Sequence, residues 1–408
     1  MKKFDVIIIG AGPAGAISAA KLNKHGFSIL ILEKMEFPRF VIGESLLPKC
    51  MNYLEELDLL SAIESENFQV KTGATFFHND SVCEFEFKNK YTEGWDYTYQ
   101  VKRADFDHAL IKAVEAKGVE VEFNATVISV DSTKERQLVE YTDFKGNTLK
   151  VESRFLIDAS GYGRVLPRLF NLQKPVTSKN RAAIFAHITD TNKSFKAATN
   201  IYIQASKDNS SWVWSIPFSD ETCSVGIVGD IEYIEQCAKN NSENFLDSLR
   251  KFPSMKERFS ESNLVINPKK IINYSVSVTK LHGDGFVLCG NATEFLDPIF
   301  SSGVTLAMSS GYLGAELAIK ELNGEKVDWE KEYSDTMNAG IDVFRTYVNA
   351  WYSNELHQII FAPNINELYK KQICSVLAGY VWDTTNPFVK KHKTLVSTLA
   401  KVIAITSE

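Results

Sequence analysis

Three glycines near the N-terminus have the spacing of a dinucleotide-binding turn. Gly10, Gly12 and Gly15 directly follow the β-branched run 4–9 and precede the small-residue stretch 16–20, which reads as a helix. In such a turn the first glycine lets the chain reverse, the second lets the backbone approach a pyrophosphate, and the third lets helix and strand pack closely. The helix N-terminus then offers free N–H groups and the positive end of its dipole to the phosphates. This pattern predicts a dinucleotide cofactor.

An acidic residue stands where the ribose of that cofactor would lie. Glu33 ends a second apolar run, 28–32, in the same βαβ pattern as the glycine turn. A carboxylate at this position accepts hydrogen bonds from ribose hydroxyls and disfavours a 2′-phosphate. The pattern therefore predicts FAD or NAD rather than NADP, and by itself it leaves the choice between those two open.

Two later strand-like runs end in polar turns, and a third segment follows them. Run 154–157 leads into Asp158 and Gly161, and run 285–289 leads into Gly290 and Asn291. With segment 297–307, these runs resemble the FAD-dependent monooxygenase superfamily of the p-hydroxybenzoate hydroxylase type. In that family the second strand-end motif reads Gly-Asp and touches the ribityl chain, so Asn291 keeps a hydrogen-bonding side chain but removes the charge.

The resemblance extends to two other segments and implies that FAD is bound. Segment 37–48 resembles the family loop near the isoalloxazine, and segment 99–107 resembles the turn where an arginine contacts the cofactor. The residues that this resemblance places at the cofactor are Gly10, Gly12, Pro13, Ala14, Gly15, Glu33, Lys34, Arg39, Gly43, Glu44, Ser45, Arg103, Asp158, Gly161, Asn291, Pro298, Gly303 and Val304.

The stretch 212–217 reads Trp-Val-Trp-Ser-Ile-Pro and narrows the family. Strand side chains alternate, so both tryptophans fall on one face. The stretch is similar to the Trp-x-Trp-x-Ile-Pro signature of flavin-dependent halogenases, which keep their substrate away from the flavin and use reduced FAD and oxygen to turn halide into hypohalous acid. This similarity implies a position near the flavin tunnel for Trp212, Trp214, Ile216 and Pro217.

The halogenase resemblance also assigns catalytic positions to Lys71 and Ser301. Lys71 falls where the family has the lysine that guides or carries the oxidised halogen. An ammonium can hydrogen-bond hypohalous acid, and a neutral amine can form a haloamine. The backbone amides of Ser302 and Gly303 are the implied halide-binding groups, in an anion-binding nest, with Ser301 facing the lysine. The alternatives are a solvated surface charge for Lys71 and a turn that binds FAD alone.

Phe300 bears on the substrate. Tryptophan halogenases have a glutamate at this position that steers the oxidised halogen, whereas members acting on phenols or pyrroles lack it. The resemblance therefore implies an electron-rich phenolic or pyrrolic ring, either free or tethered to a carrier protein, and disfavours indole. Two other hypotheses stay open: an FAD-dependent monooxygenase, dehydrogenase or alkene reductase without halogenation, and a non-catalytic flavin-binding protein.

The elements that position these residues predict an α/β fold in three parts. A Rossmann-like FAD-binding domain takes 1–170 and 276–327, an antiparallel β-sheet substrate domain takes 171–275 with strands from 72–100, and a helical region takes 328–408. The sheet strands are expected at 74–77, 83–87, 181–188, 199–203, 212–217 and 222–228.

Two further helices and one buried histidine are predicted in the later part of the chain. One helix is predicted over 239–257, with Phe245, Leu246 and Leu249 on one face, and an amphipathic helix over 389–405. His187 lies on an alternating strand and is predicted to be a hydrogen-bonded core histidine.

Composition excludes several classes of partner. The 408 residues allow two or three domains and a large core, and 45 basic against 51 acidic residues argue against nucleic acid. Six scattered cysteines form neither a disulfide framework nor a zinc site, so no metal and a reducing, cytoplasmic location are expected. No apolar run approaches the roughly 20 residues of a membrane span. Since a second glycine motif for NAD(P)H is absent, a separate flavin reductase is the expected source of reduced FAD.

Overall fold

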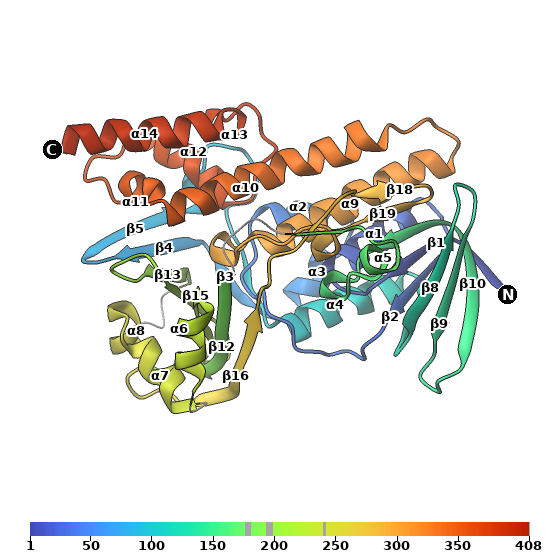
Figure 1. Ribbon diagram of the computed structural model, residues 1–408, viewed down its shortest axis with the longest axis horizontal. Helices are drawn as coiled ribbons and strands as arrows, with labels where there is room; N and C mark the ends of the chain where they lie inside the picture. Colours follow the sequence, from blue (N-terminus) through green and yellow to red (C-terminus); the bar gives the residue numbers. More distant parts are fainter. Residues whose placement is uncertain (176–180, 193–198, 240–241, 408) are drawn as a thin grey trace.

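The computed structural model describes residues 1–175, 181–192, 199–239 and 242–407. Two large β-sheets organise the chain, and the helices that end it lie along one side of the molecule, at the top of Figure 1. The α/β architecture predicted from the sequence, with a helical C-terminal part, is confirmed.

The first sheet has eight strands and a parallel centre, in the order β18-β19-β10-β1-β2-β7, with β9 paired to β10 and β8 paired to β9. Its central strands are apolar on both faces, as parallel strands covered by helices are. Their carboxyl ends meet at one edge, where a doubly wound sheet binds its ligand. The strands are β1 (Lys2–Ile9), β2 (Ile29–Glu33), β7 (Glu120–Phe123), β8 (Thr126–Ser132), β9 (Gln137–Thr142), β10 (Thr148–Asp158), β18 (His282–Gly283) and β19 (Phe286–Leu288).

Two helices pack across this sheet and bring distant segments together. The N-terminal helix α1 (Pro13–Lys24) crosses α9 (Ser302–Leu322) at Gly311, where an added Cβ would lie 2.4 Å from the Ala14 carbonyl oxygen. The Ser18 hydroxyl donates to the carbonyls of Ala14 and Gly311, at 2.8 and 2.9 Å. The remaining helices of this part are α2 (Lys49–Glu56), α3 (Leu60–Glu64), α4 (Arg103–Ala116) and α5 (Val165–Leu169).

The second sheet has seven strands in the order β16-β12-β15-β14-β13-β4-β5. Every neighbouring pair is antiparallel except β13 with β4, which run parallel with Ile201 beside Ala74. The expected strands are all present. That one pair departs from the antiparallel expectation, and the long connection between β4 and β13 is what makes a parallel pairing possible. The strands are β4 (Gly73–His78), β5 (Ser81–Glu86), β12 (Arg181–Thr189), β13 (Ile201–Ala205), β14 (Trp212–Pro217), β15 (Thr222–Asp230) and β16 (Leu264–Ile272).

One face of this sheet packs on helices and the other faces the first sheet. Alternate residues such as Ile184 and Val213 join the cluster under the helices, whereas Phe185 and Trp214 join the central core. The covering helices are α6 (Ile231–Ala238), α7 (Ser242–Arg250) and α8 (Pro253–Arg258).

The prediction of one helix over 239–257 is wrong, since α7 ends at Arg250 and α8 begins at Pro253. Phe252 is extended, because proline disfavours the helical conformation in the residue before it and has no N–H to donate. The predicted apolar face survives the break, since Phe245 and Leu249 are fully buried.

The C-terminal part is helical, as expected. It begins with a π-helical turn, η6 (Glu330–Asp335), and continues through α10 (Thr336–Tyr352), α11 (Glu355–Ile360), α12 (Glu367–Leu377), α13 (Pro387–Lys390) and α14 (His392–Ser407). The prediction of one helix over 389–405 is wrong at its start, since α13 ends at Lys390 and α14 begins at His392. Within the described ranges, none of the helices combines the length and apolar content that a membrane crossing requires.

Several short elements join these layers. They are β3 (Gln69–Lys71), β6 (Thr98–Gln100), β11 (Gln173–Lys174), β17 (Ser277–Val278), η1 (Phe87–Asn89), η2 (Gly161–Gly163), η4 (Gly290–Ala292) and η5 (Pro298–Phe300).

Candidate active site

A cleft between the two sheets gathers most of the residues predicted to bind the cofactor. The glycine turn, the segment after β2, the loop before α2 and the turn before α9 all contribute to its wall. The predicted residues that line it are Gly10, Gly12, Pro13, Ala14, Glu33, Lys34, Arg39, Gly43, Glu44, Ser45, Arg103, Gly161, Asn291, Pro298, Gly303 and Val304.

Two predicted cofactor residues, Gly15 and Asp158, are outside the lining of the cleft. A Cβ on Gly15 would lie 2.0 Å from the Gly10 carbonyl oxygen, so only glycine fits between the turn and the helix. The buried carboxylate of Asp158 accepts from the backbone N–H groups of Ser160 and Leu166, at 2.9 and 2.7 Å. Burial raises the pKa of Asp158. Both residues shape the turns that face the cleft.

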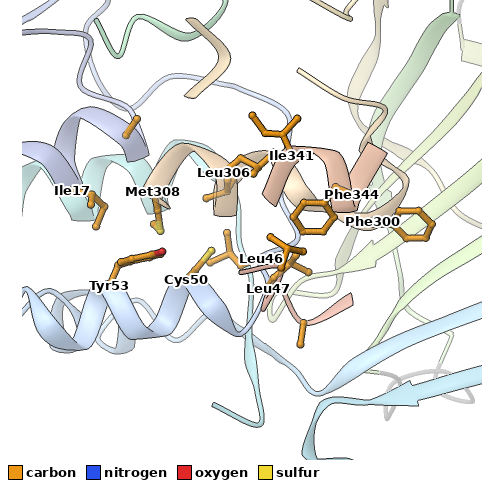
Figure 2. Close-up of a cluster of buried hydrophobic side chains, with 14 of the residues drawn as sticks. Ile17, Leu46, Leu47, Cys50, Tyr53, Phe300, Leu306, Met308, Ile341 and Phe344 are labelled. Atoms are coloured by element: carbon orange, nitrogen blue, oxygen red, sulfur yellow. The ribbon is translucent and has the colours of Figure 1, made fainter. Parts of the chain in front are cut away.

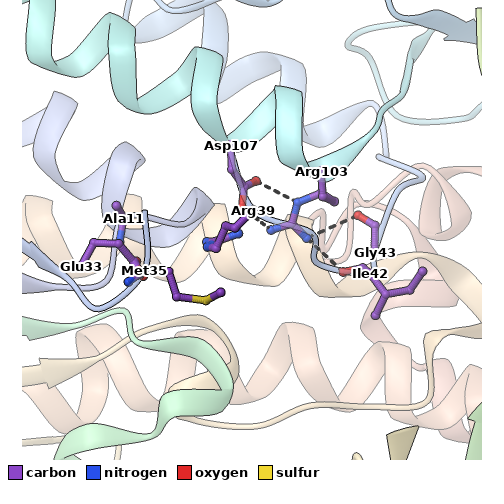
Figure 3. Close-up of polar contacts among 8 residues, drawn as sticks. All are labelled: Ala11, Glu33, Met35, Arg39, Ile42, Gly43, Arg103 and Asp107. Atoms are coloured by element: carbon purple, nitrogen blue, oxygen red, sulfur yellow. Dashed lines mark hydrogen bonds and ion pairs between the residues drawn. The ribbon is translucent and has the colours of Figure 1, made fainter. Parts of the chain in front are cut away.

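The glycine turn and Glu33 form one end of the cleft. A Cβ on Gly10 would lie 2.5 Å from the Ala159 carbonyl oxygen, which explains the glycine there. Figure 3 shows Glu33 between two backbone N–H groups: Oε2 accepts from Ala11 at 2.8 Å and Oε1 from Met35 at 3.0 Å. These bonds fix the carboxylate and leave each oxygen further acceptor capacity for a ribose.

Two arginines on the cleft wall share one buried carboxylate, which the sequence interpretation missed. Asp107, fully buried on α4, receives Arg39 Nη1 at 2.9 Å and Arg103 Nε and Nη2 at 2.8 and 2.9 Å (Figure 3). Arg103 also donates to the carbonyls of Ile42 and Gly43, at 3.2 and 3.4 Å. The i,i+4 spacing of Arg103 and Asp107 is the signal that sequence alone offered for this pair.

The loop before α2 presents two unpartnered polar atoms to the cleft. Glu44 Oε2 and Ser45 Oγ are buried, have no hydrogen-bond partner among the described residues, and belong to side chains on the cleft wall. The other Glu44 oxygen lies 2.8 Å from His187 Nε2, so His187 is the buried, hydrogen-bonded histidine that was predicted. Buried polar atoms of native proteins are almost always paired, so these two fit a polar ligand.

The second sheet supplies the opposite wall. Trp212, Trp214 and Ile216 line the cleft, as implied by their motif, whereas Pro217 does not. The two indole rings lie 5.8 Å apart, and Trp214 Nε1 donates to the Ser224 hydroxyl at 3.2 Å. Neighbouring strands and the segment after β16 add residues that the sequence interpretation missed, because no local signal shows which strand lies beside which. They are Ala183, Phe185, Ile201 and Ile271 on the strands and Tyr274 after β16.

The turn before α9 contributes backbone amides. Ser301 has a left-handed conformation, with φ at 56°, and precedes the first helical residue Ser302. The first N–H groups of a helix have no intrahelical acceptor and lie at the positive end of its dipole. Ser301 and Gly303 line the cleft, whereas the buried Ser302 side chain does not.

Lys71 lies behind the cleft rather than on its wall. Its side chain is fully buried, and Nζ donates to the Leu46 carbonyl oxygen at 2.8 Å. Burial lowers the pKa of Lys71 to about 7. A solvated surface charge is therefore excluded. The acceptor residue, Leu46, directly follows Ser45, which lies on the cleft wall. Lys71 is therefore hydrogen-bonded to a residue adjacent in sequence to that wall.

Apolar side chains surround the partner of Lys71. Figure 2 shows Leu46, Leu47 and Cys50 close to Leu306 and Phe344, and all of them belong to the central core. The aromatic ring of Phe300, next to Ser301, packs in the same core against Phe76, Tyr347 and Trp351, with centroids 6.3, 6.4 and 6.3 Å away.

The chain is similar to known flavin-binding proteins over most of its length. The family model described as FAD binding domain matches residues 3–334. The chain is also 30% identical over 393 residues to a 1H-pyrrole-2-carbonyl-(peptidyl-carrier protein) brominase of Pseudoalteromonas luteoviolacea, across 94% of this chain and 93% of that protein. The chain belongs to the flavin-dependent halogenase family. It is an FAD-dependent oxidoreductase, and FAD is the cofactor that the cleft residues fit.

This halogenase-family chain is also similar to other proteins named as halogenases and to one protein named as a flavoprotein/dehydrogenase. It is 28% identical over 409 residues to a 1H-pyrrole-2-carbonyl-(peptidyl-carrier protein) chlorinase of Pseudomonas fluorescens, across 93% of this chain and 90% of that protein. Among solved structures, a flavoprotein/dehydrogenase from Cytophaga hutchinsonii is 45% identical over the full length of both chains, with a TM-score of 0.97. The flavin-dependent brominase Bmp2 is 26% identical, across 99% of this chain and 100% of that one, with a TM-score of 0.84.

Proposed function

We propose that the protein uses reduced FAD, oxygen and halide to halogenate an electron-rich phenolic or pyrrolic ring. The observation that carries this proposal is Lys71, a fully buried amine whose pKa is lowered to about 7 and whose hydrogen-bond partner adjoins the cleft wall. Burying a lysine without a carboxylate partner costs stability, so a purely structural role favours an apolar residue there. A chemical role for the amine accounts for the cost.

The proposed roles divide between two sites. FAD, when bound and reduced, supplies the reaction with oxygen that converts halide to hypohalous acid. The free amides of Ser302 and Gly303 hold the halide at the helix N-terminus, and Ser301 orients it from the cleft wall. Lys71 receives the oxidised halogen: its neutral amine forms a nitrogen–halogen bond with hypohalous acid and releases water. The ring then takes the halogen and loses a proton, and the lysine nitrogen takes up a proton and is again an amine.

A lysine with a pKa near 7 suits this task. At neutral pH about half of its population is neutral and able to form the nitrogen–halogen bond, while the other half can hydrogen-bond hypohalous acid as an ammonium. An unburied lysine, with its pKa near 10.4, would be almost wholly protonated.

The substrate and partners follow from Phe300 and from the relatives. Phe300 stands where a glutamate would assist an indole, and its ring packs against Phe76, Tyr347 and Trp351, so this position has no carboxylate of its own to steer the halogen, which favours an activated ring. Two relatives carry names that specify a pyrrole on a peptidyl-carrier protein, so a carrier-tethered ring is the proposed form of the substrate. A separate flavin reductase supplies reduced FAD.

The test combines chemically reduced FAD, oxygen and bromide, with monochlorodimedone as the trap for hypohalous acid. We expect bromide-dependent loss of the trap in the wild type. The variant Lys71→Met is expected to keep that loss but to lose halogenation of a pyrrolyl carrier protein. Lys49→Met is the matched control, a lysine that is half-buried on α2 with a lowered pKa. If no bromide is oxidised by the wild type, the proposal fails.

A second candidate is a flavin dehydrogenase or reductase without halogenation. The name of the 45% identical Cytophaga hutchinsonii structure favours it. This candidate predicts that FAD in the wild type is reduced by an organic substrate without oxygen or halide, and anaerobic bleaching of the flavin at 450 nm on such an addition would support it. The halogenase proposal instead expects FAD to stay oxidised with NADH alone and to be reduced when a flavin reductase is added.

A further inference from the structure

A buried carboxylate immediately before the Ser301 turn joins three parts of the chain. Asp297 caps η5, and its Oδ1 accepts from the Ile299 N–H at 3.4 Å. Its Oδ2 accepts from two tyrosine hydroxyls, Tyr274 at 2.7 Å and Tyr352 at 2.9 Å. The carboxylate therefore fixes the start of the turn and is itself fixed from two sides.

Tyr352 extends the connection to the tryptophan motif. Its hydroxyl oxygen accepts from Trp212 Nε1 at 2.9 Å while its proton goes to Asp297. The guanidinium of Arg181 lies over the Tyr352 ring, 3.7 Å from its centroid, and holds the ring in place. The hydrogen bonds thus run in one direction, from the indole through the phenol to the carboxylate.

The two ends of this chain lie on opposite walls of the cleft. Trp212 and Tyr274 line it from the side of the second sheet, and Ser301 and Gly303 line it from the turn before α9. Tyr352 is the last residue of α10, so the C-terminal helices take part as well. A displacement of any one wall must therefore break a buried hydrogen bond.

We propose that Asp297, Tyr274 and Tyr352 are positioning residues through which Trp212 sets the geometry of the 301–303 turn. The inference rests on the proposed function, since the turn is the proposed halide site. It assigns to Trp212 a task beyond lining the cleft: its indole N–H occupies the Tyr352 hydroxyl oxygen as a donor and so directs the hydroxyl proton toward Asp297. Buried networks of this kind hold one arrangement because each missing bond is costly.

The first test compares two Tyr→Phe variants of the same helix. Tyr352→Phe removes two hydrogen bonds, the one from Trp212 and the one to Asp297. The buried hydroxyl of Tyr347 has no hydrogen-bond partner among the described residues, so Tyr347→Phe removes none of the bonds described. In Tyr352→Phe we expect hydrogen exchange of the segment 297–304 to accelerate about tenfold, the effect of losing a hydrogen bond to a charged group. Tyr347→Phe is expected to leave that exchange unchanged.

The second readout separates positioning from general stability. Bromide affinity of the FAD-loaded protein, followed by flavin fluorescence, is expected to fall about tenfold in Tyr352→Phe while FAD affinity changes less than twofold. A merely structural role would lower both affinities together and would overturn the inference. Unchanged exchange of 297–304 in Tyr352→Phe would also overturn it.

A double variant tests whether Trp212 acts on the turn through Tyr352. If the indole acts through the phenol, Trp212→Phe combined with Tyr352→Phe is no worse for exchange of 297–304 than Tyr352→Phe alone. Additive effects would show that Trp212 acts independently. Exchange is measurable in a protein that oxidises no halide, so failure of the proposed function and failure of this network give different results.

Discussion

At the scale of single residues, burial of Lys71 lowers the pKa of its amine, as the proposed chemistry requires, and also lowers the stability of the fold. Its folded pKa, about 7, lies below the ordinary value because burial disfavours the ammonium. Between pH 7 and the unfolded pKa near 10.4, the unfolded chain binds more protons than the folded one, so stability rises with pH. At and below pH 7 the full cost of the buried amine is present.

This linkage predicts the behaviour of Lys71→Met. At pH 7 we expect the variant to be more stable than the wild type by about 2–4 kcal/mol, after allowance for the lost bond to Leu46, and the difference should shrink toward pH 10. Urea unfolding of both proteins at pH 7, 8, 9 and 10 measures it. Parallel pH profiles would contradict a lowered pKa in the folded state.

Among the described residues, the Glu44 carboxylate has one hydrogen-bond partner, His187, which gives a second residue-scale prediction. His187→Leu leaves both Glu44 oxygens without a hydrogen bond in a buried position, and we expect the free energy of unfolding to fall by about 2 kcal/mol. FAD affinity should fall too, because Glu44 is no longer oriented toward the cleft. His187→Gln, which keeps a donor, is expected to recover part of both losses.

The control for that series is His25→Gln at an exposed histidine. Its free energy of unfolding is expected to stay within about 0.5 kcal/mol of the wild type. Equal effects of His25→Gln and His187→Leu would rule out the Glu44 pairing as the cause.

At the scale of elements, Asp107 joins α4 to the loop before α2. It holds Arg39 and Arg103 at once, so Asp107→Asn weakens two cationic contacts with the cleft in one step. We expect FAD affinity to fall by about 10- to 100-fold and the free energy of unfolding by about 3 kcal/mol, since a buried charge network loses its anion. Fluorescence titration with FAD and urea unfolding measure the two effects.

Asp105→Asn is the matched control, because Asp105 is an exposed carboxylate in the first turn of the same helix. It changes the charge of α4 equally but removes no contact with either arginine. A loss of FAD affinity in Asp105→Asn as large as in Asp107→Asn would mean that net charge, not the buried pairing, controls binding.

Local signals explain which elements were predictable. The glycine turn, its flanking strands and the tryptophan strand each carry a pattern within about ten residues, and the structure has them where expected. The break at Pro253 was also a local signal, which the interpretation of 239–257 as one helix ignored. The parallel pairing of β13 with β4 had no local signal, because it joins segments more than 120 residues apart.

For the candidate site, the sequence predicted which residues take part better than it predicted how they are arranged in space. Motifs identified the cofactor residues that line the cleft, and the halogenase resemblance selected Lys71. Burial of that lysine, its bond to Leu46 and the place of Tyr352 depend on how distant elements pack, which no spacing encodes. The domain boundaries and the roles of the site residues stay predictions.

At the scale of the whole molecule, the cleft is the place where both sheets meet. Its glycine-turn end, at Gly10 and Glu33, belongs to the first sheet, and its other end is walled by Phe185 and Trp214 of the second. A ligand that spans the cleft therefore contacts both sheets and should protect both from local unfolding. A ligand confined to one end should protect only the sheet that it contacts.

This coupling predicts different effects of FAD and ADP. At 100 times its dissociation constant, either ligand should raise the free energy of unfolding by about 2.7 kcal/mol. FAD is expected to slow hydrogen exchange in β1 and also in β12 and β14, because the proposed binding mode puts the isoalloxazine against the second sheet. ADP has only the nucleotide half and should protect β1 alone. Protection of β12 and β14 by ADP equal to that by FAD would place the adenosine at the wrong end, and with it the proposed route from flavin to Lys71.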